Sequence, residues 1–88
     1  MIFFRRVVGE SMLPTLKPGK IVWAHEVRGF KENQVVVAFV NGREGIKRIT
    51  NIDNGVITLS SDNKESTSNP YARIPDKDVM GVVFWPKV

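Results

Sequence analysis

The stretch Gln34-Val35-Val36-Val37-Ala38-Phe39-Val40-Asn41-Gly42 carries the strongest fold signal in this chain. Its apolar, β-branched run predicts a buried strand over residues 34–40, and we expect that strand to be central in a sheet. Asn41-Gly42 favours a two-residue hairpin turn, while Arg43-Glu44-Gly45 behind it would also allow a longer loop. A strand over residues 45–52 should therefore return antiparallel.

Turn residues divide the remainder of the chain into short strands. Lys17-Pro18-Gly19 and Asp53-Asn54-Gly55 are typical turns, residues 61–69 are a polar loop, and residues 76–78 fit one helical turn. The strands predicted between them cover residues 3–8, 20–27, 56–60 and 79–85. No segment sustains a helical period, so the sequence predicts a mostly β, small antiparallel fold, as a single domain over residues 1–88.

Composition excludes several kinds of chemistry. The 88 residues include no cysteine and one histidine, so disulfides, thiolate nucleophiles and multi-histidine metal sites are ruled out, and we expect no metal or cofactor. The net charge of +4 comes from scattered basic residues, which makes a small nucleic-acid-binding β-barrel a less favoured alternative.

Hydropathy predicts a soluble, cytoplasmic protein. The longest apolar run, residues 35–40, is far shorter than the roughly 20 residues that a membrane-spanning helix needs, so we expect no transmembrane anchor. Met1-Ile2-Phe3-Phe4, followed by Arg5-Arg6, is a candidate for peripheral contact with a membrane surface.

The segment Gly9-Glu10-Ser11-Met12-Leu13-Pro14-Thr15-Leu16 is the best candidate for catalytic chemistry. A serine behind glycine and ahead of a proline turn can expose its hydroxyl beside free backbone N–H groups. The structural alternative is a strand-to-turn junction in which Ser11 caps a short helical turn.

A nucleophilic serine needs a base, and the chain offers His25 or a lysine. A lysine acts as a base only when it is desolvated, because its pKa is ordinarily about 10.4. Lys47 fits best, since it lies in the strand Gly45-Ile46-Lys47-Arg48-Ile49; Lys20 is second choice. His25 alternates with Ile21 and Trp23, which is also the pattern of a packed strand residue.

Taken together, these motifs resemble the serine–lysine peptidases of the type I signal peptidase and LexA-type superfamily. The resemblance covers nearly the whole chain and rests on Gly9-x-Ser11-Met12-x-Pro14-Thr15-Leu16, Lys47-Arg48 and Ser61-Asp62-Asn63. It implies a coiled antiparallel β fold with Ser11 as nucleophile and Lys47 as general base. It also implies an oxyanion hole and substrate edge at Gly9, Ser11 and Met12.

The resemblance assigns supporting roles to Ser61, Asp62 and Thr67. Ser61 stands where signal peptidases have glycine, and Thr67 stands where they have a serine that hydrogen-bonds the lysine. Asn69 and Tyr71 replace an Asp and an Arg of that family. Some of the motifs resemble those of the signal peptidases, especially the small proteases that mature nickel-type superoxide dismutase. Other motifs resemble those of the LexA-type self-cleaving repressors.

The resulting prediction is a serine endopeptidase that processes a protein or propeptide substrate. The alternative on the same fold is a non-catalytic peptide-binding module. The sequence leaves the substrate, the oligomeric state and the branch of the superfamily open.

Overall fold

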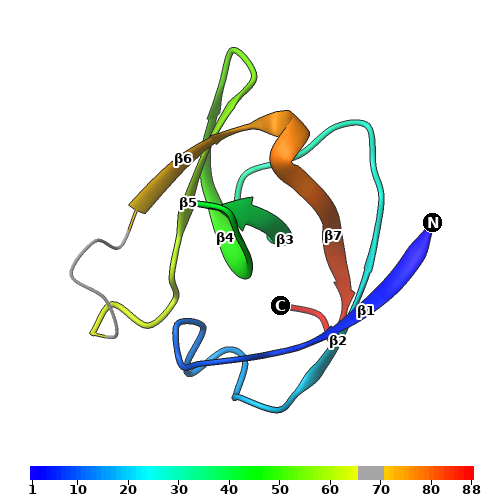
Figure 1. Ribbon diagram of the computed structural model, residues 1–88, viewed down its shortest axis with the longest axis vertical. Coiled ribbons are helices and arrows are strands. Elements are labelled where there is room, and N and C mark those ends of the chain that lie inside the picture. Colours follow the sequence, from blue (N-terminus) through cyan, green and yellow to red (C-terminus); the bar gives the residue numbers. More distant parts are fainter. Residues whose placement is uncertain (66–70) are drawn as a thin grey trace.

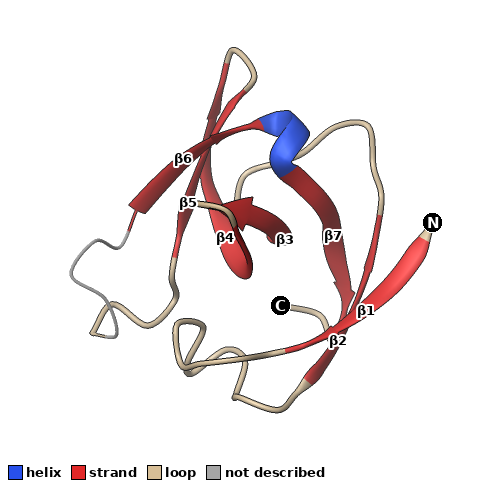
Figure 2. Ribbon diagram, in the orientation of Figure 1, coloured by secondary structure: helices blue, strands red, loops and turns tan. Residues whose placement is uncertain are grey.

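The computed structural model describes residues 1–65 and 71–88, which form a curled antiparallel sheet (Figure 1). One 3₁₀ turn, η1 (Asp76–Asp78), precedes the last strand, and the rest is strand and loop (Figure 2). The strands of the described chain are β1 (Ile2–Arg6), β2 (Ile21–His25), β3 (Val35–Val40), β4 (Arg43–Asp53), β5 (Val56–Ser60), β6 (Tyr71–Pro75) and β7 (Val79–Trp85).

The order of strands across the sheet is β1-β2-β7-β3-β4-β5-β6, and all neighbouring pairs are antiparallel. β7 therefore lies between β2 and β3 and joins the first two strands to the other four. Gly81 of β7 permits this packing, since an added Cβ would lie 2.7 Å from the Phe3 ring and 2.8 Å from the His25 carbonyl oxygen. The Phe3 ring therefore packs against β7 at position 81, where there is room only for glycine.

The central strand β3 is buried on both faces, as its apolar sequence predicts. Val35 and Val37 pack in a cluster with residues of β2, β7 and the loop after β1. Val36 and Ala38, on the opposite face, pack with residues of β4, β5 and β6. Because one strand supplies both clusters, the curled sheet encloses two adjoining apolar cores.

Both predicted hairpins have two-residue turns. Val40 pairs with Arg43, so the turn is Asn41-Gly42 and the longer loop does not form. Asn41 and Gly42 both have positive φ, as do Asn54 and Gly55 in the turn from β4 to β5. This is the conformation that Asn-Gly favours, and it matches the twist of the flanking strands.

The structure differs from the sequence predictions mainly at the two edge strands, while β2 is shorter than the predicted 20–27 and β4 is longer than the predicted 45–52. The first strand ends at Arg6 and not at residue 8: the backbone of Val7 still bonds Lys20 and Gly19, but Gly9 at φ +80° turns the chain away. The strand β6 was not predicted, because it buries only Ile74 fully and ends in a proline. Such a short sequence is typical of an edge strand.

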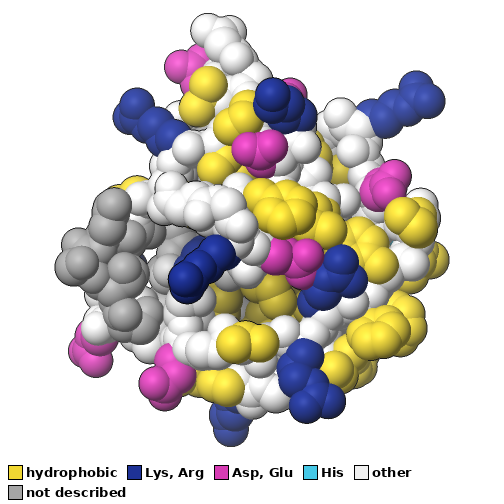
Figure 3. Space-filling model, viewed as in Figure 1, with side chains coloured by type: hydrophobic (Ala, Val, Ile, Leu, Met, Phe, Trp, Pro, Cys, Tyr) yellow, Lys and Arg dark blue, Asp and Glu magenta, His cyan; other side chains and the backbone are white. Residues whose placement is uncertain are grey.

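Within the described residues, no helix is long and apolar enough to span a membrane. On the face shown in Figure 3, Lys and Arg side chains are interspersed with Asp and Glu. The scattered charge that the sequence indicated is therefore seen on this surface.

Candidate active site

The loop after β1 holds Ser11 half-buried above the first apolar core. Met12 and Leu16 anchor this loop, being 1% and 2% exposed, and the Leu16 N–H donates to the Met12 carbonyl over 2.9 Å. Burying each of these side chains stabilises the fold by roughly 1.5–3 kcal/mol. The loop that carries Ser11 is therefore fixed by the core on the side next to the serine.

The backbone conformation at position 9, and not close packing, explains why this residue is glycine. An added Cβ at Gly9 would meet nothing within 4 Å, so this glycine does not serve a close backbone approach. Its φ of +80° is the reason for glycine, because side chains rarely adopt that backbone conformation. Residues 9–16 form bends and turns, and the Ser11 side chain makes no hydrogen bond to a described residue that would cap the turn from Met12 to Leu16.

Lys47 lies on the apolar face of β4. Its cross-strand partner Val36 and its same-face neighbour Ile49 are both fully buried. The Lys47 side chain passes Gly45, with Cε 3.9 Å from where a Cβ would stand. Burial lowers the pKa of the Lys47 amine below its ordinary value of 10.5, because the charged form loses water.

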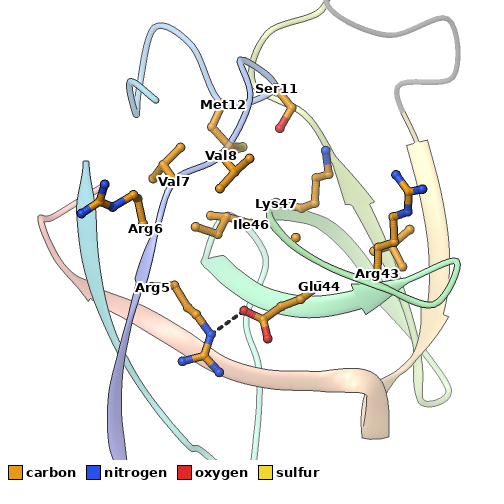
Figure 4. Close-up of a pocket in the computed structure, with 12 residues that line it drawn as sticks. Arg5, Arg6, Val7, Val8, Ser11, Met12, Arg43, Glu44, Ile46 and Lys47 are labelled. Carbon is orange, nitrogen blue, oxygen red and sulfur yellow. Dashed lines mark hydrogen bonds and ion pairs between the residues drawn. The ribbon is translucent and has the colours of Figure 1, made fainter. Parts of the chain in front are cut away.

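A cavity of about 380 Å³ brings the predicted nucleophile and base together. Ser11 and Lys47 both line it, and in Figure 4 the Lys47 amine extends toward the Ser11 hydroxyl. Val8, Met12 and Ile46 supply apolar lining. Between these two described side chains no direct hydrogen bond is formed; the Lys47 Nζ donates instead to Ser61 Oγ at 3.0 Å.

Ser61 and Asn63 connect the two halves of this site. Ser61 directly follows β5, is 5% exposed, and accepts the bond from Lys47. The Asn63 backbone N–H donates to the Ser11 carbonyl at 2.8 Å, and its side-chain Nδ2 donates to the Glu10 carbonyl at 3.0 Å. One short segment thus holds both the serine loop and the lysine amine.

Asp62, between these two residues, binds the neighbour of Lys47. Arg48 Nε and Nη2 each donate to an Asp62 carboxylate oxygen at 2.9 Å, and Thr15 Oγ1 donates to the same carboxylate. These bonds hold the pKa of Asp62 below its ordinary value of 3.8, Arg48 having the larger effect. The same Arg48–Asp62 bond raises the pKa of Arg48.

The remaining candidates lie elsewhere or outside the described residues. The His25 ring packs edge-on against Phe84, at 5.2 Å between ring centroids, and does not line the cavity. The Lys20 amine lies over the Trp85 ring. Thr67 and Asn69 fall outside the described residues, and Tyr71 opens β6 with its side chain exposed.

Arg43 and Glu44 also line the cavity, and neither residue was predicted from the sequence to belong to the site. An ion pair from Arg5 to Glu44 crosses between β1 and β4. The alternation of side chains along β4 could have indicated Arg43, because Arg43, Gly45 and Lys47 must share one face of the strand. In the described part of the chain, no cluster of three His, Asp or Glu side chains is arranged to hold a metal ion.

The curled antiparallel sheet, with a serine loop packed beside β4, is a serine-peptidase type of fold. The sequence model of the Peptidase S24-like family matches residues 1–84, and the chain belongs to this family. The predicted superfamily and fold are thereby confirmed, whereas the nickel superoxide dismutase branch stays a prediction. A comparison with curated proteins finds no match.

Proposed function

We propose that the protein is a serine endopeptidase in which Ser11 is the nucleophile and Lys47 the general base. The observation that carries this proposal is the shared cavity: a half-buried serine faces a lysine amine whose pKa burial lowers. Neither Asp nor Glu bonds that amine among the described residues, so desolvation acts without a compensating carboxylate. A neutral amine is what proton abstraction requires.

In the proposed reaction, neutral Lys47 takes the proton of the Ser11 hydroxyl while Oγ attacks the substrate carbonyl carbon. The resulting ammonium gives that proton to the leaving amine as the C–N bond breaks, which leaves an ester on Ser11. Water then attacks the ester, Lys47 takes the water proton, and the Ser11 oxygen recovers a proton as the acid product departs.

Two backbone N–H groups at Ser11 and Met12 are our candidates for the oxyanion hole. Leu13 and Leu16 donate their N–H groups within the loop, whereas the N–H groups of Ser11 and Met12 have no acceptor among the described residues. Two free donors beside the attacking oxygen are the usual means of holding a tetrahedral intermediate. We assign this role to Ser11 and Met12, with Gly9 setting the direction of the loop.

Ser61 is the positioning residue for the base. Its Oγ accepts one N–H of Lys47, and a neutral amine keeps its lone pair for Ser11. Asp62 fixes the same segment through Arg48 and Thr15. Ser61 thus gives Lys47 a hydroxyl partner, at a position where the signal peptidases that the chain resembles have glycine.

Two unpaired strand edges border the cavity and would hold an extended substrate. In the described chain, β1 pairs with β2 alone, and residues 43–47 of β4 pair only with β3 because β5 joins from Arg48 onward. Backbone groups on such edges are free to bond a peptide strand. A protein segment in extended form is therefore the proposed substrate.

The test uses the full chain and a synthetic library of random peptides, read by mass spectrometry. Ser11→Ala and Lys47→Ala should each remove cleavage while the circular dichroism spectrum stays that of the parent. Lys77→Ala, at an exposed lysine in η1, is the matched control and should cleave normally. Cleavage that survives Lys47→Ala would eliminate the dyad.

The alternative is a peptide-binding module without catalysis, and the absence of a direct Ser11–Lys47 hydrogen bond in the described site favours it. Catalytic hydrogen bonds are often long before substrate binds, so this geometry does not exclude the enzyme. Labelling of Ser11 by a serine-directed acylating inhibitor separates the two. A pure binding module would bind the peptides and leave Ser11 unlabelled.

A further inference from the structure

The cavity beside the proposed dyad has an excess of positive charge. Its lining includes Arg5, Arg6, Arg43 and Lys47 against one acidic residue, Glu44, in the described chain (Figure 4). Arg5 and Glu44 form an ion pair, so their charges balance. Neither Arg6 nor Arg43 forms an ion pair with a described residue. Arg6 extends away from Ser11 and Lys47 in Figure 4, whereas Arg43 lies on the Lys47 side, so Arg43 is the guanidinium group that is open to an acidic ligand there.

Arg43 has a defined spacing from the proposed base. Side chains alternate along a strand, so Arg43 and Lys47 share one face of β4, and Gly45 between them adds no side chain. At roughly 3.3 Å per residue, the Cα atoms of Arg43 and Lys47 are about 13 Å apart along the strand. A peptide strand beside β4 advances by the same step, so four of its residues span that distance.

We propose that this cavity selects an extended peptide with an acidic side chain about four residues from the bond that is cut, and that Arg43 is the residue that recognises it. This inference rests on the proposed function and adds the chemistry of the substrate. The carboxylate meets the Arg43 guanidinium, whose planar fork suits paired hydrogen bonds. The apolar lining near Ser11 receives the side chain next to the cut bond.

The experiment reads the sites at which the full chain cuts a library of random 14-residue peptides. Asp and Glu should be enriched three to five positions from the cut, on one side of it. An exposed charge pair of this kind corresponds to a preference of roughly two- to fivefold over neutral residues, and added salt should reduce it. Arg43→Glu should reverse the preference toward Lys and Arg.

Arg73→Glu is the matched control, because Arg73 is an exposed arginine on β6 that does not line this cavity. It changes the net charge by the same amount and should keep the acidic preference. Cleavage without an acidic preference, or a preference that Arg43→Glu leaves unchanged, overturns the inference and leaves the peptidase proposal standing.

A binding measurement tests the inference apart from catalysis. The Ser11→Ala variant is titrated with a fluorescent peptide that carries Asp at the fourth position from its centre, and with the same peptide carrying Asn. Tighter binding of the Asp peptide, lost in Ser11→Ala/Arg43→Glu, supports recognition even if no peptide is cut. Equal binding of the two peptides overturns it.

Discussion

The surroundings of Lys47 and of Arg48 differ sharply, although the two cations are adjacent on β4. Lys47 is on the face of the second apolar core, and its amine bonds a neutral hydroxyl. Arg48 points to the other face and forms two bonds to the carboxylate of Asp62. The pKa of Lys47 is lowered, whereas the pKa of Arg48 is raised. Alternation along one strand thus separates a desolvated lysine from an ion-paired arginine.

Among the substitutions that test this difference between Lys47 and Arg48, Lys47→Met should have the largest effect. Loss of the proposed general base should lower the rate of cleavage by about 10²–10⁴-fold. Stability should rise at neutral pH, because the unfolded chain binds the Lys47 proton more tightly than the folded one does. Stability of the parent should therefore increase as pH rises toward 10.5, and that of Lys47→Met should increase less.

Urea unfolding at several pH values, together with the peptide cleavage assay, checks this prediction. Lys31→Met, at an exposed lysine outside the cavity, is the matched control and should show neither effect. A loss of stability in Lys47→Met at neutral pH would contradict the view that burial of the ammonium is costly.

The next effect should come from Asp62→Asn. This change removes the carboxylate from two charged hydrogen bonds with Arg48 and should lower the free energy of unfolding by about 1–3 kcal/mol at pH 7. The folded pKa of Asp62 is lowered, so its contribution is complete above the ordinary value of 3.8 and is lost as pH falls below it.

The parent and Asp62→Asn should therefore converge in stability under acid. Thermal melting followed from pH 7 to pH 2 measures the convergence. A difference between the two proteins that stayed constant over that range would show that Asp62 does not contribute through its charge.

A smaller effect is expected from Ser61→Ala. Loss of the hydroxyl that holds the Lys47 amine should reduce the cleavage rate by roughly tenfold, which corresponds to about 1.4 kcal/mol. The Ser61 Oγ stabilises the ammonium as well, so its removal should move the acidic limb of the pH–rate profile to lower pH. Ser61→Thr, which keeps a hydroxyl, should restore both properties.

A merely structural role for Ser61 would change the rate without moving that limb. Titration of the Lys47 side chain by NMR in the Ser61→Ala protein gives the same information without an activity measurement. An unchanged Lys47 pKa would contradict the positioning role.

The fold could be predicted where local chemistry decides it. The residues of the apolar run in β3 and of the Asn-Gly turns are sufficient to determine the local structure. The elements η1, β5 and β7 also have the predicted boundaries. β6 could not be found, because edge position, and not hydrophobic pattern, determines it. The end of β1 depends on the φ of Gly9, which a residue letter does not specify.

The candidate site was predictable by residue type but not by contact. The apolar neighbours of Lys47 indicated desolvation, and the burial of Val36 and Ile49 explains it. The bond from Lys47 to Ser61 depends on how β5 leaves the sheet, which becomes known only with the register of β4 and β5. The position of Arg43 at the cavity likewise becomes known only with the register of β3 and β4.

The position of β7 has a consequence for how this protein is made. Ser11 belongs to the part of the chain built on β1 and β2, Lys47 belongs to the part built on β3 to β6, and β7 is the strand that pairs with both. A ribosome delivers the N-terminal strands first. Until β7 emerges, the two parts have no common strand, so we expect the cavity between Ser11 and Lys47 to form only after residues 79–85 have been synthesised.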